Sequence, residues 1–280
     1  MAIQSLEQTI GTEPKKIDYS RESFDLYSKV QNKLLKVISY FNTFEFYGRE
    51  NIESIIHGPA IIVSNHPEAT KDVILVAELF KREGCQLFYG ARSELFKKEE
   101  FVGLIKKHLK KHLNVFAHLI RNDYMERFAE FAESSLPKIG TISLDVVKQH
   151  QNSGAFKKMA KYLGEYDRKI VLLQFDKATS EANKHSIFHG AKKGAAVAAS
   201  LTYMHYGKDV PVVPIGIYGT KGLIPVSYMI THLKKKPIKI KVGQPLYITS
   251  FLDKENPVES LRQALNDSIW GLIGELVRMK

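Results

Sequence analysis

The sequence predicts an α/β protein built on one central sheet, and two features of the chain carry that prediction. Seven short runs rich in Val, Ile, Leu, Phe and Tyr have the length and composition of strands. Stretches with helical spacing of apolar residues lie between many of these runs. Strands that alternate with helices favour a mainly parallel or mixed sheet with helices on its faces.

The expected strands are residues 43–48, 60–64, 86–91, 139–145, 169–175, 210–217 and 237–242. We expect them to form one domain over residues 43–280, because the chain contains no low-complexity linker and no internal repeat. Residues 1–42 precede it as a polar tail and an amphipathic helix. Apolar residues recur in that helix at three- and four-residue steps from residue 22 to residue 41. Its apolar face either packs on the core or touches a bilayer.

Composition restricts the class of protein. A hydrophobic content of 44% over 280 residues is enough for one sizeable core. The single cysteine, Cys85, excludes an internal disulfide framework and suits a reducing compartment. The amino terminus lacks the basic and apolar regions of a signal peptide, and no window is apolar for the 18 or more residues that a spanning helix needs. We therefore expect a cytoplasmic protein, soluble or bound to the surface of a membrane.

The formal net charge of +11 attracts either nucleic acid or an anionic membrane. No zinc-finger spacing or RNA-recognition motif is present, so we expect no nucleic-acid partner. Residues 97–138 form an insertion whose first part, 97–121, has apolar residues at helical steps and holds seven Lys/Arg and two Glu. That pattern is typical of a helix at the surface of an anionic membrane, with the lysines Lys106, Lys107, Lys110 and Lys111 on its basic face. The alternative is a core-packed helix with a solvated basic face.

The stretch from Ser64 to Asp72 contains the candidate catalytic residues. It places His66 at the end of an apolar strand and Asp72 at the start of an apolar helix. Open α/β sheets bind their ligands at the edge formed by the carboxyl ends of their strands, which is where His66 is expected. A carboxylate within reach of an imidazole fixes its tautomer and stabilises the imidazolium, so His66 is a candidate general base. Because no Ser or Cys nucleophile is evident beside it, the base would activate an external hydroxyl or amine.

Short motifs that follow one another in order make the chain resemble the glycerolipid acyltransferases, the lysophosphatidate and glycerol-3-phosphate acyltransferases. The segment Gly58 to Pro67 is similar to the opening of that family, with its Asn-His and downstream Asp. Further similar segments are residues 90–96, 140–145, 171–180, 188–195, 210–215 and 239–246. The resemblance covers about residues 44–275 and extends the fold expectation to an acyltransferase-like sheet.

The resemblance implies the transfer of a fatty acyl group from acyl-CoA or acyl carrier protein to a hydroxyl of a glycerolipid, lysophospholipid or other lipid precursor. His66 would be the base and Asp72 would orient it. The implied substrate-binding residues are Asn65, Arg92, Lys177, Thr179 and Lys192. Asn65 either orders the loop or contacts substrate. The resemblance implies no cofactor and no metal, and it implies work at the inner face of a membrane as a peripheral protein.

The chain departs from the family pattern at three places. Five residues rather than four separate His66 from Asp72, so Asp72 reaches His66 only if the loop absorbs the extra residue. Val146 falls where the second motif has arginine, and residues 176–180 replace the family's Pro-Glu-Gly-Thr-Arg. These changes put the usual acceptor in doubt, and Lys177 is either a new anion contact or a sign that the pocket has decayed. They also support an alternative function, a catalytically silent lipid-binding protein.

Two other patterns have a structural interpretation. His108 with His112, and His185 with His189, have the four-residue spacing of zinc ligands, but a third ligand is not apparent, so the sequence predicts no metal site. The lysines at positions 234–236, 239 and 241 are typical of a solvated edge strand.

Overall fold

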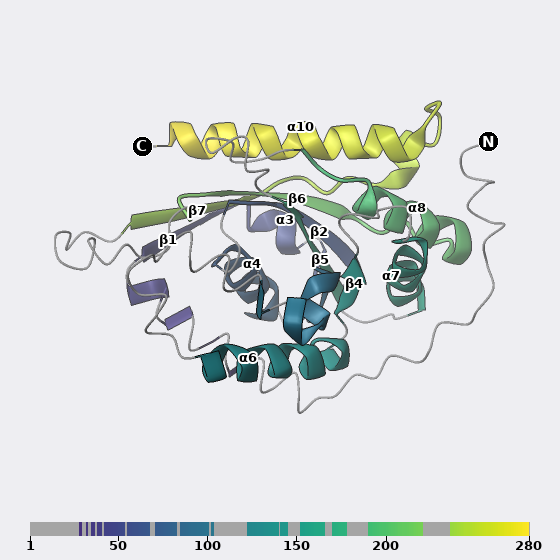
Figure 1. Ribbon diagram of the computed structural model, residues 1–280. Helices are drawn as coiled ribbons and strands as arrows, with labels where there is room; N and C mark the ends of the chain where they lie inside the picture. The colour runs from purple at the N-terminus through teal and green to yellow at the C-terminus, as the bar shows by residue number, and fades with distance from the viewer. Residues whose placement is uncertain are drawn as a thin grey trace.

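The computed structural model contains a seven-stranded sheet with helices on both faces (Figure 1). The residues that it describes are 28, 29, 32, 35, 36, 38–40, 42–53, 55–67, 71–82, 85–100, 102–103, 122–139, 141–144, 152–165, 170–177, 190–220 and 236–279. The strands are β1 (Asn42–Tyr47), β2 (Ala60–His66), β3 (Gln86–Arg92), β4 (Ile142–Leu144), β5 (Ile170–Lys177), β6 (Val212–Tyr218) and β7 (Lys236–Val242). The mixed α/β class predicted from the sequence is therefore confirmed.

The strand order is β1-β7-β6-β2-β5-β3-β4, and the sheet is mixed. Strands β2 to β6 are mutually parallel through the pairs β2–β6, β2–β5, β3–β5 and β3–β4. Strand β7 runs antiparallel to β6, and β1 runs parallel to β7. Each predicted run contains a strand, and residue 139, the expected start of the fourth run, instead ends the 3-10 turn Pro137–Ile139.

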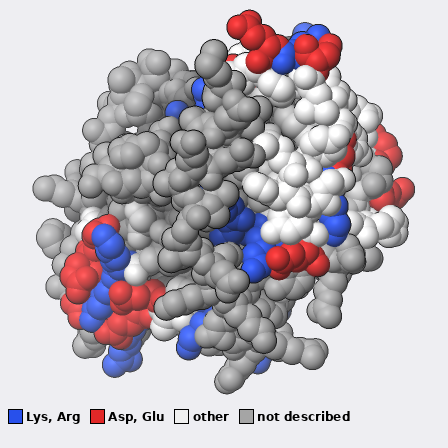
Figure 2. Space-filling view, turned by 90° about the vertical axis from the view of Figure 1, so that its right-hand side faces the viewer, with Lys and Arg blue, Asp and Glu red and all other residues white. Residues whose placement is uncertain are grey.

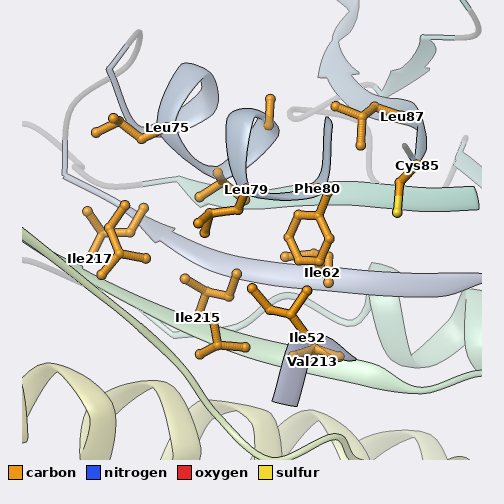
Figure 3. Close-up of a cluster of buried hydrophobic side chains, with 14 of the residues drawn as sticks. Ile52, Ile62, Leu75, Leu79, Phe80, Cys85, Leu87, Val213, Ile215 and Ile217 are labelled. Carbon is orange, nitrogen blue, oxygen red and sulfur yellow. The ribbon is translucent and has the colours of Figure 1, made fainter. Parts of the chain in front are cut away.

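Helix α4 (Lys71–Arg82) covers one face of the sheet. Its side chains Leu75, Leu79 and Phe80 point toward Ile62 of β2 and Ile215 of β6 (Figure 3). Phe80 has 0% exposure, and burying such a side chain contributes about 1.5–3 kcal/mol relative to leaving it in water. The short helix α3 (Glu50–Glu53) packs into the same cluster through Ile52.

Helices α7 (Ser153–Glu165), α8 (Gly194–Tyr206) and α10 (Pro257–Arg278) pack on the second cluster, which includes Ile61 and Val63. Ile61 and Val63 alternate along β2 with Ala60 and Ile62 of the first cluster, as expected for a strand buried on both sides. In Figure 1, α10 lies along one face of the sheet, while α4 and α6 (Asn122–Ser135) lie on the other side.

Part of the N-terminal segment packs on the core. Its described positions between 28 and 40 have helical backbone. Ile38 is buried in the α4-side cluster and Leu35 packs against it, whereas Tyr40 is 73% exposed. At these positions the structure favours the core-packing interpretation over the bilayer-facing one.

The lysines of β7 differ from the expectation of a solvated edge strand, because β7 lies between β1 and β6. Lys239 is buried and donates to the carbonyl of Met279, and Lys241 pairs with Glu275. These lysines therefore fasten the C-terminal end of α10 to the sheet.

Within the part of the chain that the structure describes, no helix combines the length and the apolar character needed to cross a bilayer.

Candidate active site

His66 is the last residue of β2, at the carboxyl edge of the five parallel strands. The residues before it, from Ala60 to Asn65, are all buried, so the strand leads straight from the core to this edge. The register of β2 with β5 continues to the end of both strands and pairs His66 with Lys177. The general-base candidate thus lies where open α/β sheets bind ligands.

Asp72 lies in the first turn of α4 and faces His66. The distance from Nδ1 of His66 to Oδ2 of Asp72 is 3.2 Å, which is within hydrogen-bonding range. The Asp72 side chain is 0% exposed, while that of His66 keeps 20% exposure. The proximity of the two side chains that was predicted from the sequence is therefore confirmed.

This geometry has a direct chemical consequence. If Nδ1 carries the ring proton, as a neighbouring carboxylate favours, Nε2 is the lone-pair nitrogen and is the atom that can accept a proton from a substrate. The carboxylate would also stabilise the imidazolium that results. Asp72 also lies at the positive end of the α4 helix dipole, where acidic side chains are common.

Asn65 is completely buried and bonds to the neighbouring strand β6. Its Nδ2 donates to the carbonyl of Ile217 at 2.9 Å, and its Oδ1 accepts from the Ile217 N–H at 2.7 Å. Both functional groups of the amide are therefore used inside the protein. Of the two interpretations that the sequence allowed, the structure favours loop ordering over substrate contact.

Arg92 and Lys177 are the last residues of two strands, β3 and β5, that lie on the side of β2 away from β6. Arg92 is the last residue of β3 and pairs with Leu144 of β4. Lys177 is the last residue of β5. The backbone positions of both candidates thus lie at the same carboxyl edge as His66, separated from it by one strand in the case of Arg92.

Lys192 is exposed in the segment that leads into α8, and α10 holds that segment in place. The Arg262 guanidinium donates to the carbonyl of Ala191 at 3.2 Å, and Oδ1 of Asn266 accepts from the Ala191 N–H at 3.4 Å. Lys193 pairs with Glu259 at 3.2 Å. The hydrogen bond from Arg262, followed by the one from Lys193, lowers the pKa of the Glu259 carboxyl.

Neither Arg262 nor Asn266 was suggested by the sequence. They lie more than 70 residues from Ala191 along the chain, and nothing in their local pattern indicates a partner. The same is true of Ile217, which is 152 residues from Asn65.

Other candidates lie outside the described residues. They are Thr179, the four lysines Lys106, Lys107, Lys110 and Lys111, the replaced motif position Val146, and the histidine pairs His108/His112 and His185/His189.

Some of the basic side chains that the structure describes have acidic neighbours. In Figure 2, Lys and Arg side chains near the centre of the view and at its lower left lie beside Asp and Glu side chains. Lys161 of α7, for example, pairs with Glu165 one turn later at 3.7 Å.

The chain is similar to the crystal structure of the 1-acyl-sn-glycerophosphate (LPA) acyltransferase, PlsC, from Thermotoga maritima. The match has 19% sequence identity and a TM-score of 0.47, and it covers 91% of this chain and 84% of that chain. No protein-family model and no curated protein matches the sequence.

Proposed function

We propose that the protein is an O-acyltransferase. It would move a fatty acyl group from a thioester, acyl-CoA or acyl carrier protein, to a hydroxyl of a glycerolipid, lysophospholipid or other lipid precursor. The observation that carries the proposal is the 3.2 Å contact between His66 and buried Asp72 at the carboxyl edge of the sheet. The ordered motifs of the sequence give the pair its proposed reaction.

In the proposed reaction, Nε2 of His66 accepts the proton of the acceptor hydroxyl as its oxygen attacks the thioester carbonyl. A new C–O bond forms, and collapse of the tetrahedral intermediate breaks the C–S bond. The imidazolium returns its proton to the departing thiolate, so the enzyme ends the cycle unchanged. Asp72 holds the imidazole in the required tautomer and stabilises its charged form. The step needs no metal and no redox cofactor.

The acceptor is proposed to carry an anionic group, because cationic residues end or follow strands at the same edge of the sheet as His66. Lys177 and Arg92 are strand-end residues, and Lys192 is exposed before α8. An arginine or lysine gives a phosphate a charge-assisted hydrogen bond, which Val146 and Ser180 cannot give. These cations would replace the missing arginines of the second and third motifs.

The proposed place of action is the cytoplasmic face of a membrane. A fatty acyl donor and a lipid acceptor both favour a site close to a bilayer, and the basic segment 97–121 is the proposed contact.

The decisive experiment is to incubate the full chain with labelled acyl-CoA or acyl carrier protein and a panel of lysophospholipids, glycerol 3-phosphate and uncharged alcohols. Acylated product supports the proposal. Loss of that product on His66→Ala, by ~10²- to 10⁴-fold, assigns the base. His57→Ala is the matched control, because His57 is exposed in the loop before β2 and should leave the rate unchanged.

Two results would contradict the proposal. Equal rates for His66→Ala and the unaltered protein would remove His66 from the reaction. Binding of lipid without turnover of any acceptor would favour the alternative, a catalytically silent lipid-binding protein with this fold.

A further inference from the structure

The ladder between β2 and β6 ends before the catalytic candidate is reached. Its registered pairs run from Ile61 with Val212 to Ser64 with Ile215. Beyond that pair, the backbone groups of Ile217 bond to the side chain of Asn65 instead. A primary amide presents one donor and one acceptor with the spacing of a peptide group, so it can stand in for a strand residue.

The last residues of β2 are thus held from two sides. On one side, the backbone register with β5 extends as far as His66 and Lys177. On the other side, the two bonds from Asn65 to Ile217 take over from the backbone ladder. Both Asn65 and Ile217 are 0% exposed, so removal of the Asn65 side chain takes the partners of the Ile217 N–H and carbonyl away at a buried site.

His66 directly follows Asn65 in the chain, and its ring contacts the carboxyl group of Asp72 in α4. A rotation of the backbone at residue 65 therefore swings the imidazole relative to the carboxylate. The contact has little room for such a movement, because the 3.2 Å between the two atoms is already at the long end of the range for a hydrogen bond.

We infer that Asn65 is a positioning residue for His66: its two bonds to Ile217 fix the strand end so that the imidazole meets Asp72 in the reactive tautomer. The inference adds a role for Asn65 to the proposed acyl transfer, and its prediction about kcat rests on that proposed function. Asn65 itself does not touch the substrate. Its loss should lower kcat while leaving KM within a few-fold, since the substrate contacts stay in place.

Three variants of the full chain separate this role from general stability. Asn65→Ala removes both bonds. Asn65→Asp keeps the acceptor for the Ile217 N–H but turns a carboxylate oxygen toward the Ile217 carbonyl. Asn51→Ala is the matched control, because Asn51 is also buried and its Nδ2 donates to the Val242 carbonyl at 3.0 Å, at the far end of β7 from the Ile217 side.

The first measurement is the ¹⁵N NMR spectrum of the histidine rings, with the His66 signals assigned by their loss in His66→Ala. It reports which ring nitrogen carries the proton and does not depend on turnover. We expect Asn65→Ala to shift the His66 signals toward the tautomer mixture of a free imidazole, Asn65→Asp to shift them less, and Asn51→Ala to leave them in place.

The second measurement is the rate of acyl transfer, together with the thermal unfolding midpoint. We expect kcat to fall on the order of 10²-fold in Asn65→Ala, as for a small misplacement of a catalytic group. Asn51→Ala should lower the unfolding midpoint without changing kcat.

An unaltered His66 spectrum in folded Asn65→Ala would overturn the inference, and in Asn65→Asp it would do the same if the alanine variant fails to fold. A kcat loss no larger than that of Asn51→Ala would also overturn it. Failure of the proposed function can be told apart from failure of this inference. The former appears as no turnover by the unaltered protein, and the NMR spectrum still reports on the role of Asn65 in that case.

Discussion

Lys177 lies opposite His66 in the register between β5 and β2, so the two Cα atoms are one strand spacing apart, about 4.8 Å. The sequence has lysine at this position where the resembling family has an acidic residue within its third motif. A lysine whose backbone lies next to the proposed base is chemically useful if the acceptor brings a negative charge with it.

The first prediction concerns this cation. Lys177→Gln should raise KM for a phosphate-bearing acceptor such as lysophosphatidate by roughly 10- to 100-fold, because a hydrogen bond to a charged group is worth about 1.5–3 kcal/mol. KM for an uncharged alcohol should change little. Steady-state kinetics with both acceptors measures the difference, and Lys208→Gln serves as a control on a lysine that follows α8. A similar change in KM for both acceptors would count against an anion contact.

The second prediction concerns the buried carboxylate. Asp72→Asn keeps the shape of the side chain but removes the charge that stabilises the imidazolium, so kcat should fall by as much as ~10²- to 10⁴-fold with KM nearly unchanged. Asp267→Asn, an exposed position of α10, is the matched control. If Asp72→Asn transfers acyl groups at the rate of that control, the carboxylate has no part in the reaction.

The third prediction tests how closely α10 packs on the sheet. A Cβ built on Gly216 of β6 would lie 2.8 Å from Cβ of Leu272 and 3.3 Å from the backbone nitrogen of Ile273. Gly216→Ala must therefore push α10 outward, and such overpacking costs about 1–3 kcal/mol.

Chemical denaturation measures this cost. Gly271→Ala is the control one residue before the contact, because a Cβ there meets nothing within 4 Å. It should stabilise the protein by roughly 0.5–1 kcal/mol, since alanine is the better helix former. Equal stability of the two alanine variants would show that α10 does not approach β6 so closely.

The strands were predictable from the sequence, whereas their partners were not. Runs such as Ala60–His66 are apolar because they are buried on both sides, and that burial is visible in composition alone. The place of β7 inside the sheet, between β1 and β6, depends on contacts between distant segments. The lysines of β7 were misread for this reason, since a partner such as Met279 leaves no local signal.

The site also has one part that was predictable from the sequence and one that was not. The order strand, histidine, helix, aspartate was enough to predict that His66 and Asp72 lie together, because a short loop leaves the two groups few alternatives. The partner of Asn65 was not predictable, since an amide that bonds to backbone groups of Ile217 imposes no requirement on the Ile217 side chain.

The last prediction concerns the membrane and uses the basic segment 97–121. Two of its lysines are already paired in the structure: Lys97 with Glu100 at 2.7 Å and Lys98 with Glu130 of α6 at 2.6 Å. The hydrogen bond to Glu130 raises the pKa of Lys98. The four lysines on the predicted basic face, Lys106, Lys107, Lys110 and Lys111, are the ones expected to meet lipid.

Changing all four to Gln should weaken binding to anionic vesicles, because each lysine near such a surface contributes about 1 kcal/mol, or on the order of 10²- to 10³-fold together. The loss should shrink as salt rises, since salt screens the attraction. A variant with Lys157, Lys161, Lys208 and Lys254 changed to Gln is the matched control, because it removes the same charge from described positions outside the segment. Co-sedimentation at low and moderate salt compares the two. Equal binding by both variants would mean that net charge alone drives the association, and the segment would then be a core-packed helix whose lysines face water.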